Sequence, residues 1–279
     1  MLSESRLYTF LNHKENYLLH FFVGEKLIRD LALIHSMNVH GFTYFRDAVL
    51  TFMPMVSLLK SGENLGLYID SEDPKIRLKI ETNAQGLVRT LLLPENLDNI
   101  PPFLTGKARL NKNQSDGHSY TSVINLEHIA LQDIVNKILI ESYQISGSVI
   151  LGLMVDQSLL VTKLPDTKNE DVTENLNLSE YIKKYKIFFD SVLNKCFENE
   201  DEVLSAFSNT EFNFLSSKTI RLFCGCTKER MISYLWALKN ETPEGLFGDN
   251  EKTLEIVCDY CKKKYVLSKN DFVVPNKKS

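Results

Sequence analysis

The sequence predicts an α+β protein with three parts: a mixed α/β sheet domain, a helical linker and a small C-terminal domain built on four cysteines. Three observations support this fold class. Short apolar runs with both strand-like and helix-like spacing alternate along the first part of the 279-residue chain. An acidic stretch follows them, and two close pairs of cysteines lie near the C-terminus. We place the three parts at residues 1–168, 169–220 and 221–279.

The elements of the first part follow from their apolar spacing. A short helix with Leu7, Phe10 and Leu11 facing inward is expected at the start. Pro54 is expected to kink or divide the third of the predicted helices. After that first short helix, helices are expected at residues 26–37, 44–59 and 129–143. Turn residues and alternation predict strands at 17–23, 65–69, 76–81, 87–93 and 119–124, and a hairpin at 149–155 and 159–164.

Composition and motifs exclude several classes of function. Hydrophobic residues at 43% and charged residues at 24% are typical of a globular protein that is not membrane-embedded. A net charge of −4 argues against a dedicated nucleic-acid-binding protein. No glycine-rich phosphate loop and no Ser-His-Asp or Cys-His set can be argued from spacing. We therefore expect a protein that is not an enzyme.

The linker is predicted to be an aromatic helix within an acidic stretch. It begins near Asn177, with Glu180 as a capping partner, and a second short helix is expected at residues 200–207. Either this aromatic face is docked on the core of the first part, or its docking is marginal and stress releases it to bind other polypeptides. Composition alone does not distinguish the two. The candidate binding face carries Tyr181, Tyr185, Phe188, Phe189 and Phe197.

The four C-terminal cysteines predict a zinc site. Cys224 and Cys226 form one pair, Cys258 and Cys261 form the other, and a few tens of residues separate the pairs. Two such pairs are typical of a tetrahedral site in which four thiolates hold one Zn²⁺ per chain. All six histidines precede residue 130, so a catalytic zinc with an open position is not indicated. The neighbouring cations Lys228, Arg230 and Lys262–Lys264 are placed to offset the charge of four thiolates.

The main alternative for these cysteines is a pair of structural disulfides in a secreted domain. Residues 1–20 lack the basic start, apolar core and cleavage site of a leader, and no run of eighteen apolar residues occurs. We therefore expect a cytoplasmic protein that does not associate with membranes, in a compartment that keeps thiols reduced. Cys196 lies outside the ligand pattern and is expected to be a packed small hydrophobe.

The residues around the ligands resemble a known family. The stretch Phe-Cys-Gly-Cys-Thr-Lys-Glu-Arg at residues 223–230, followed by Cys-Asp-Tyr-Cys at 258–261, closely resembles the C-terminal redox switch of the heat shock protein 33 family. Leu-Leu at 159–160 with Leu-Pro at 164–165 is similar to the end of that family's N-terminal domain. The usual Gly-Asp-Gly-Pro turn differs, since Ser-Glu-Asp-Pro stands at 71–74.

The resemblance implies a redox-regulated holdase chaperone that binds unfolding client proteins without ATP. It implies that oxidation forms the disulfides Cys224–Cys226 and Cys258–Cys261, that zinc leaves, and that the linker and N-terminal domain expose apolar surface. Thiolates on zinc are the form that oxidants attack, and a disulfide cannot ligate the metal. The resemblance further implies a monomer in the reduced state and a homodimer after oxidation.

Two other classes remain open. One is a constitutive zinc-ribbon adaptor that binds RNA or a protein partner, although the sequence lacks a basic face interleaved with aromatic residues. The other is a thiol oxidoreductase, in which the CxxC pair would begin a helix after a strand. In this chain a lysine run and a strand-like segment at 265–267 follow the pair instead.

Overall fold

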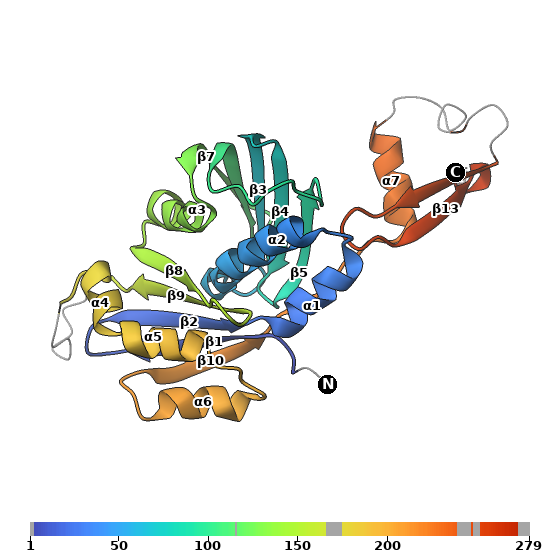
Figure 1. Ribbon diagram of the computed structural model, residues 1–279. Helices are drawn as coiled ribbons and strands as arrows, with labels where there is room; N and C mark the ends of the chain where they lie inside the picture. The colour runs from blue at the N-terminus through green and yellow to red at the C-terminus, as the bar shows by residue number, and fades with distance from the viewer. Residues whose placement is uncertain (1–2, 115, 166–174, 239–246, 248–251, 273–279) are drawn as a thin grey trace. The chain divides into compact units, whose positions relative to one another are not determined.

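The computed structural model of the chain describes residues 3–114, 116–165, 175–238, 247 and 252–272 (Figure 1). The chain divides into two compact units, Met1–Leu222 and Phe223–Ser279. The helices predicted as a linker pack within the first unit. The second unit contains the four predicted metal ligands.

Two β-sheets form the framework of the first unit (Figure 1). Neighbouring strands are antiparallel, apart from the parallel pair β11 and β5. The five-stranded sheet has the order β10-β1-β2-β9-β8, with β1 at Arg6–Asn12, β2 at Tyr17–Val23, β8 at Gly147–Leu151, β9 at Gln157–Lys163 and β10 at Asn213–Thr219. The six-stranded sheet has the order β11-β5-β4-β3-β6-β7, with β3 at Asn64–Asp73, β4 at Ile76–Asn83, β5 at Leu87–Leu93, β6 at Leu104–Asn113, β7 at Ser119–Ile129 and β11 at Arg221–Leu222.

The larger hydrophobic core of this unit takes side chains from one face of each sheet and from the helices that pack with them. Phe22 and Leu160 enter it from the five-stranded sheet, and Leu67 and Leu78 enter it from the six-stranded sheet. The helical segments in sequence order are α1 (Glu25–Ile34), α2 (Val39–Phe52), the 3₁₀ helix η1 (Met53–Leu58), α3 (Leu131–Ile138) and the π-helical turn η2 (Leu139–Tyr143).

A second core lies on the opposite face of the five-stranded sheet. Leu19 and Phe21 of β2 point into it, so β2 is buried on both faces. The covering layer comes from the predicted linker and consists of α4 (Leu178–Lys184), α5 (Lys186–Leu193) and α6 (Glu200–Ser208) (Figure 1). An apolar sheet face and an apolar helical layer therefore shield each other from water.

Most predicted elements are confirmed. The strands β2, β3, β4, β5 and β7 and the β8–β9 hairpin lie where alternation placed them. Pro54 divides the expected second long helix into α2 and η1, because proline cannot donate a backbone hydrogen bond. The cap of α4 is a complete capping box: the Glu180 backbone N–H donates to the Asn177 side chain at 3.0 Å, and the Asn177 N–H donates to the Glu180 carboxylate at 3.0 Å.

Two expectations about these elements were wrong, and two strands were not expected. The segment that was expected to be a short N-terminal helix is the strand β1. Leu7 enters one core and Phe10 enters the other. A strand that is buried on both faces can have the same spacing of apolar residues as a helix. The strand β6 was not expected, because Lys107 and Arg109 on its outward face interrupt the apolar pattern. The edge strand β10, which begins at Asn213, was also not expected. The single linker helix is broken at Tyr185, whose φ of −98° and ψ of 9° lie outside the helical region.

Candidate metal centre

The second unit presents its cysteines from two loops. Cys224 and Cys226 lie in the segment before α7 (Lys228–Leu238). At the start of this helix, the Met231 backbone N–H donates a hydrogen bond to the Thr227 carbonyl at 3.1 Å. The strands β12 (Thr253–Val257) and β13 (Lys264–Ser268) form an antiparallel hairpin, and a 3₁₀ turn, η4 (Lys269–Phe272), follows them.

The second pair occupies the turn of that hairpin. The Lys262 backbone N–H donates to the Cys258 carbonyl at 2.8 Å, and the Cys258 N–H donates to the Lys263 carbonyl at 3.0 Å. Lys262 has a φ of 58°, the left-handed conformation that reverses the chain here. This turn holds Cys258 and Cys261 on the same side of the hairpin end, where both thiols meet the first pair.

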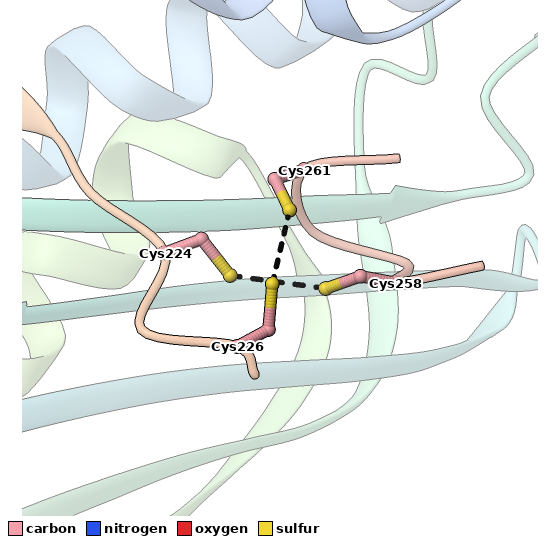
Figure 2. A group of neighbouring side chains, drawn as sticks. All are labelled: Cys224, Cys226, Cys258 and Cys261. Atoms are coloured by element: carbon pink, nitrogen blue, oxygen red, sulfur yellow. Dashed lines mark hydrogen bonds between the residues drawn. The ribbon is translucent and has the colours of Figure 1, made fainter. Parts of the chain in front are cut away.

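The four thiols form one compact group. Their sulfur atoms all lie within 4.8 Å of one another, and Figure 2 shows them converging on a common centre. The Sγ atoms of Cys224 and Cys258 are 3.7 Å apart, and those of Cys226 and Cys261 are 3.3 Å apart. A tetrahedron with zinc–sulfur bonds of about 2.3 Å has sulfur–sulfur edges of about 3.8 Å. The donor set therefore fits one tetrahedral ion, and the spacing is too long for a disulfide bond of about 2.05 Å.

The surroundings of the thiols set their ionisation. Burial raises the pKa of the Cys224 thiol, and burial together with hydrogen bonds from neighbouring thiols raises the pKa of Cys261 to about 12. Burial acts in the same direction on Cys226, but hydrogen bonds from the Tyr265 hydroxyl, at 3.1 Å from its sulfur, and from neighbouring thiols outweigh it and lower the pKa of Cys226 to about 7. These hydrogen bonds therefore favour the thiolate form of Cys226, the form that binds metal.

The predicted cations lie around the ligands in fixed contacts. The Arg230 guanidinium donates to the carbonyl of Gly225, between the first two ligands, at 2.7 Å. Lys228 forms an ion pair with Asp271 at 2.8 Å, and Lys264 forms one with Glu255 at 3.0 Å. Lys263 lies 5.2 Å from the centre of the Tyr265 ring. Two of these cations thus already have carboxylate partners, and Arg230 makes the most direct approach to the ligand loop.

The thiols are also part of the core of the second unit. Cys258 is buried, and the other three cysteines pack against the same cluster at partial exposure. The buried members of that cluster are Met231, Phe247, Cys258, Tyr265, Leu267 and Phe272. We therefore expect the stability of so small a core to depend on what holds the four sulfur atoms together. A search of the described residues for three or more close His, Cys, Asp or Glu side chains finds this group of four cysteines.

A family model described as Hsp33 protein matches residues 5–268 of the chain. The chain belongs to the Hsp33 family. Proteins named 33 kDa chaperonin are similar along most of their length. The protein of Aquifex aeolicus is 23% identical, and the match covers 83% of this chain and 77% of the relative. The protein of Prochlorococcus marinus strain MIT 9515 is 24% identical, and the match covers 92% of this chain and 86% of the relative.

The fold of the family is likewise shared. The crystal structure of the 33 kDa chaperonin (heat shock protein 33 homolog) from Thermotoga maritima superimposes with a TM-score of 0.75 over 97% of each chain, at 15% sequence identity. None of the helices within the described ranges is both long enough and apolar enough to cross a membrane.

In this member of the Hsp33 family, the predicted aromatic linker face lies against the five-stranded sheet. Tyr181 stacks on Tyr17 with 3.7 Å between ring centres, and Phe197 meets Phe21 edge-on at 5.9 Å. Tyr181, Phe189 and Phe197 are buried, whereas Tyr185 and Phe188 are half-buried at the edge of the same core.

Sequence reasoning missed a polar cluster that holds this layer down. The carboxylate of Glu15, from the turn between β1 and β2, is buried and accepts hydrogen bonds from Lys184 at 2.6 Å and from the Tyr185 hydroxyl at 3.0 Å. Asn12 donates to both the Tyr181 and the Tyr185 hydroxyls, at 3.3 and 3.2 Å. No sequence signal reveals this cluster, because its members are far apart along the chain. Cys196 was also misjudged, since it is exposed rather than packed.

Proposed function

We propose that the chain is a redox-regulated holdase chaperone. In the reduced state the four thiolates hold one Zn²⁺ and the apolar faces of the first unit are covered. Oxidation removes the ligands, and the uncovered faces bind unfolding proteins and prevent their aggregation. The observation that carries the proposal is the compact four-thiol group, in which Cys258 is a buried member of the small core of the second unit and the other three cysteines pack against that core. Membership of a family whose relatives are named 33 kDa chaperonin supports the chaperone part.

The switch chemistry needs only the cysteines and an oxidant such as a peroxide. Two zinc-bound thiolates, one molecule of hydrogen peroxide and two protons from solvent give one disulfide and two molecules of water, so each pair loses two electrons. We propose the pairings Cys224–Cys226 and Cys258–Cys261, each within one loop. Zinc bound by the four thiolates would crosslink the loop before α7 to the turn of the β12–β13 hairpin. Loss of either pair removes half of the ligands and leaves the second unit without its central crosslink.

The proposed client surface is the interface between the linker helices and the five-stranded sheet. Tyr181, Phe189 and Phe197 now bury their rings against that sheet, and separation would expose aromatic side chains on both partners. The proposed coupling to the metal site is through the chain itself, because β10 and β11 lead directly into Cys224. Disorder in the second unit would remove the constraint on the segment that follows α6.

The remaining parts of the proposal follow from the same faces. Exposed apolar faces on two copies can cover each other, so we propose a monomer when reduced and a homodimer when oxidised. Clients are unfolded proteins, and we propose no nucleic-acid or membrane partner and no enzymatic activity. A four-thiolate site requires a reducing compartment, which supports the cytoplasm.

The test measures metal content and holdase activity on the same samples. Full-length protein, reduced or treated with peroxide, is assayed for bound zinc and for suppression of light scattering by a thermally unfolding client. We expect about one equivalent of zinc and little suppression when reduced, and zinc loss with strong suppression after oxidation. Cys196→Ser is the matched control, because it removes an exposed thiol outside the site.

Two results would contradict the proposal. Absence of zinc from the reduced protein would remove the switch. Equal suppression by both forms would instead favour a constitutive zinc-ribbon adaptor, which keeps one binding state regardless of oxidant.

A further inference from the structure

The six-stranded sheet carries a groove on the face turned away from the hydrophobic core. Inward side chains of its strands, such as Leu67 and Ala108, enter the larger core, whereas the alternate residues point outward. A hollow of 840 Å³ on the outward face takes its lining from five consecutive strands of the order β5-β4-β3-β6-β7. A smaller hollow of 300 Å³ shares Asp70, Arg77 and Arg109 with it, so the two form one continuous groove.

The groove has the length of an extended chain. Five strands at a spacing of about 4.8 Å span about 19 Å, which corresponds to about six residues of extended polypeptide. Two strands are irregular beside it: β3 shifts register between Ser71 and Asp73, and β6 shifts between Leu104 and Gly106. Gly106 has a φ of 153°, and a Cβ there would lie 2.3 Å from the Asp70 carbonyl oxygen. Such bulges bend a sheet, and here they lie beside the hollow.

Positive charge predominates in the groove. Its cations outnumber its acids, Asp70 and Glu72, in a chain whose net charge is negative. Asp70 is shared between Arg77, at 2.9 Å, and Arg109, at 3.4 Å, and so neutralises only one of them. Within the described residues, the other three cations make no hydrogen bond or ion pair through their side chains. These unpaired cations are Lys75, Lys79 and Lys107.

The rest of the lining distinguishes a peptide from a nucleic acid. Exposed aliphatic side chains, Leu93 of β5 and Val123 of β7, lie at the two ends of the larger hollow with the charged residues between them, and no aromatic ring lines it. Tyr68 lines the smaller hollow, but Arg109 lies over its ring at 5.8 Å. Bases would therefore find no open ring to stack on, and the acids Asp70 and Glu72 would repel a continuous phosphate backbone. A peptide with both carboxylates and aliphatic side chains complements the lining.

We propose that this groove binds extended polypeptide segments that carry both acidic and aliphatic residues, in the reduced as well as the oxidised protein. Its lining belongs to the first unit and to the sheet that does not carry the linker helices. Binding there needs neither release of the linker nor loss of metal. The inference therefore goes beyond the proposed redox switch and does not rest on it.

The test is fluorescence anisotropy of a labelled peptide with reduced, full-length protein. The probe is an octapeptide of alternating glutamate and leucine or valine, compared with the same peptide carrying glutamine. We expect saturable binding of the glutamate peptide that weakens as salt is added, and much weaker binding of the glutamine peptide. Lys75→Glu/Lys107→Glu should weaken binding about tenfold or more, because two attractions become repulsions. Both lysines are exposed, so circular dichroism should confirm an unchanged fold.

The matched control is Arg29→Glu/Lys60→Glu, which reverses two exposed charges of the first unit outside the groove. It should bind the peptide as the parent protein does. Equal binding of the glutamate and glutamine peptides, or equal loss in both double variants, would overturn the proposal. So would tighter binding of a single-stranded oligonucleotide that displaces the peptide. Peptide binding that persists when the holdase assay fails would uphold the groove and reject only the switch.

Discussion

The two units of the chain are stabilised in different ways. The first unit has two extensive hydrophobic cores on either side of the five-stranded sheet, and its polar contacts add to a fold that apolar burial already supports. The second unit has a single small cluster in which Cys258 is itself a buried member and three further cysteines pack at the margin. Apolar burial in the first unit is thus spread over many residues, whereas the small cluster of the second unit includes or contacts four cysteines. The proposed function uses this difference, since it requires the first unit to stay folded while the second responds to oxidants.

The largest effect is expected from removing one metal ligand. Cys258→Ser should unfold the second unit, because a structural zinc contributes on the order of 10 kcal/mol or more to a small module and serine does not ionise to replace the thiolate. Hydrogen exchange should show loss of protection across residues 252–272 and retained protection in β2 and β9. Cys196→Ser should change neither. Retained protection in the second unit would mean that its apolar cluster suffices without the ligand.

A smaller effect is expected from the linker layer of the first unit. Phe189→Ala should lower the free energy of unfolding of the α4–α6 layer by about 3 to 5 kcal/mol, because the ring is fully buried among aromatic neighbours. Ile187→Ala on the same helix should cost less than about 0.5 kcal/mol, since that side chain is 88% exposed. Denaturant unfolding and hydrogen exchange of the layer measure both. Similar losses in the two variants would mean that helix formation, rather than ring burial, holds the layer.

Phe188 provides a further test of how much ring burial stabilises the layer, because its ring is only half-buried. Phe188→Ala should cost less than Phe189→Ala, and the double variant should loosen the layer enough to raise the holdase activity of the reduced protein. The measurement is client light scattering with metal content checked in parallel. An inactive double variant with full zinc would separate linker release from client binding.

The polar cluster under the linker should contribute an intermediate amount. Glu15→Gln removes the charge of a buried carboxylate that accepts from Lys184 and Tyr185, and should destabilise the layer by about 1 to 3 kcal/mol. Lys14→Gln breaks the exposed ion pair with Glu211 at 2.8 Å and should destabilise the first unit less than Glu15→Gln does, because solvent screens an exposed pair. Unfolding of both variants in urea provides the comparison, and equal costs would show that burial of Glu15 is unimportant.

The smallest expected effect is a dependence on pH. Hydrogen bonds from Lys14 and from the Tyr185 hydroxyl lower the pKa of Glu211 below its ordinary value of 4.5. Because the pKa is lower in the folded chain, the stabilisation is fully present above pH 4.5 and is lost as the pH falls towards the folded pKa. Glu211→Gln should flatten this part of the stability profile of the first unit. A profile unchanged by the substitution would assign the acid sensitivity to other carboxylates.

The sequence by itself determined the local and covalent features of this protein. Spacing alone placed both cysteine pairs, because ligands within a pair are separated by one or two residues and need no distant partner. It also placed the strand β2, the division at Pro54 and the capping box of Asn177 and Glu180, each of which depends on interactions over a few residues.

Tertiary structure decided what depends on residues far apart in the chain. Leu7 and Phe10 fit a helix by spacing, and only the two cores on either side of β1 make that segment a strand. The buried Glu15 finds Lys184 and Tyr185 only when the linker folds back on the sheet. The groove forms because five strands bring their outward residues side by side, a juxtaposition that no single strand encodes. The spacing of residues is a property of one segment of the sequence, whereas the burial of a side chain depends on the distant residues that pack against it.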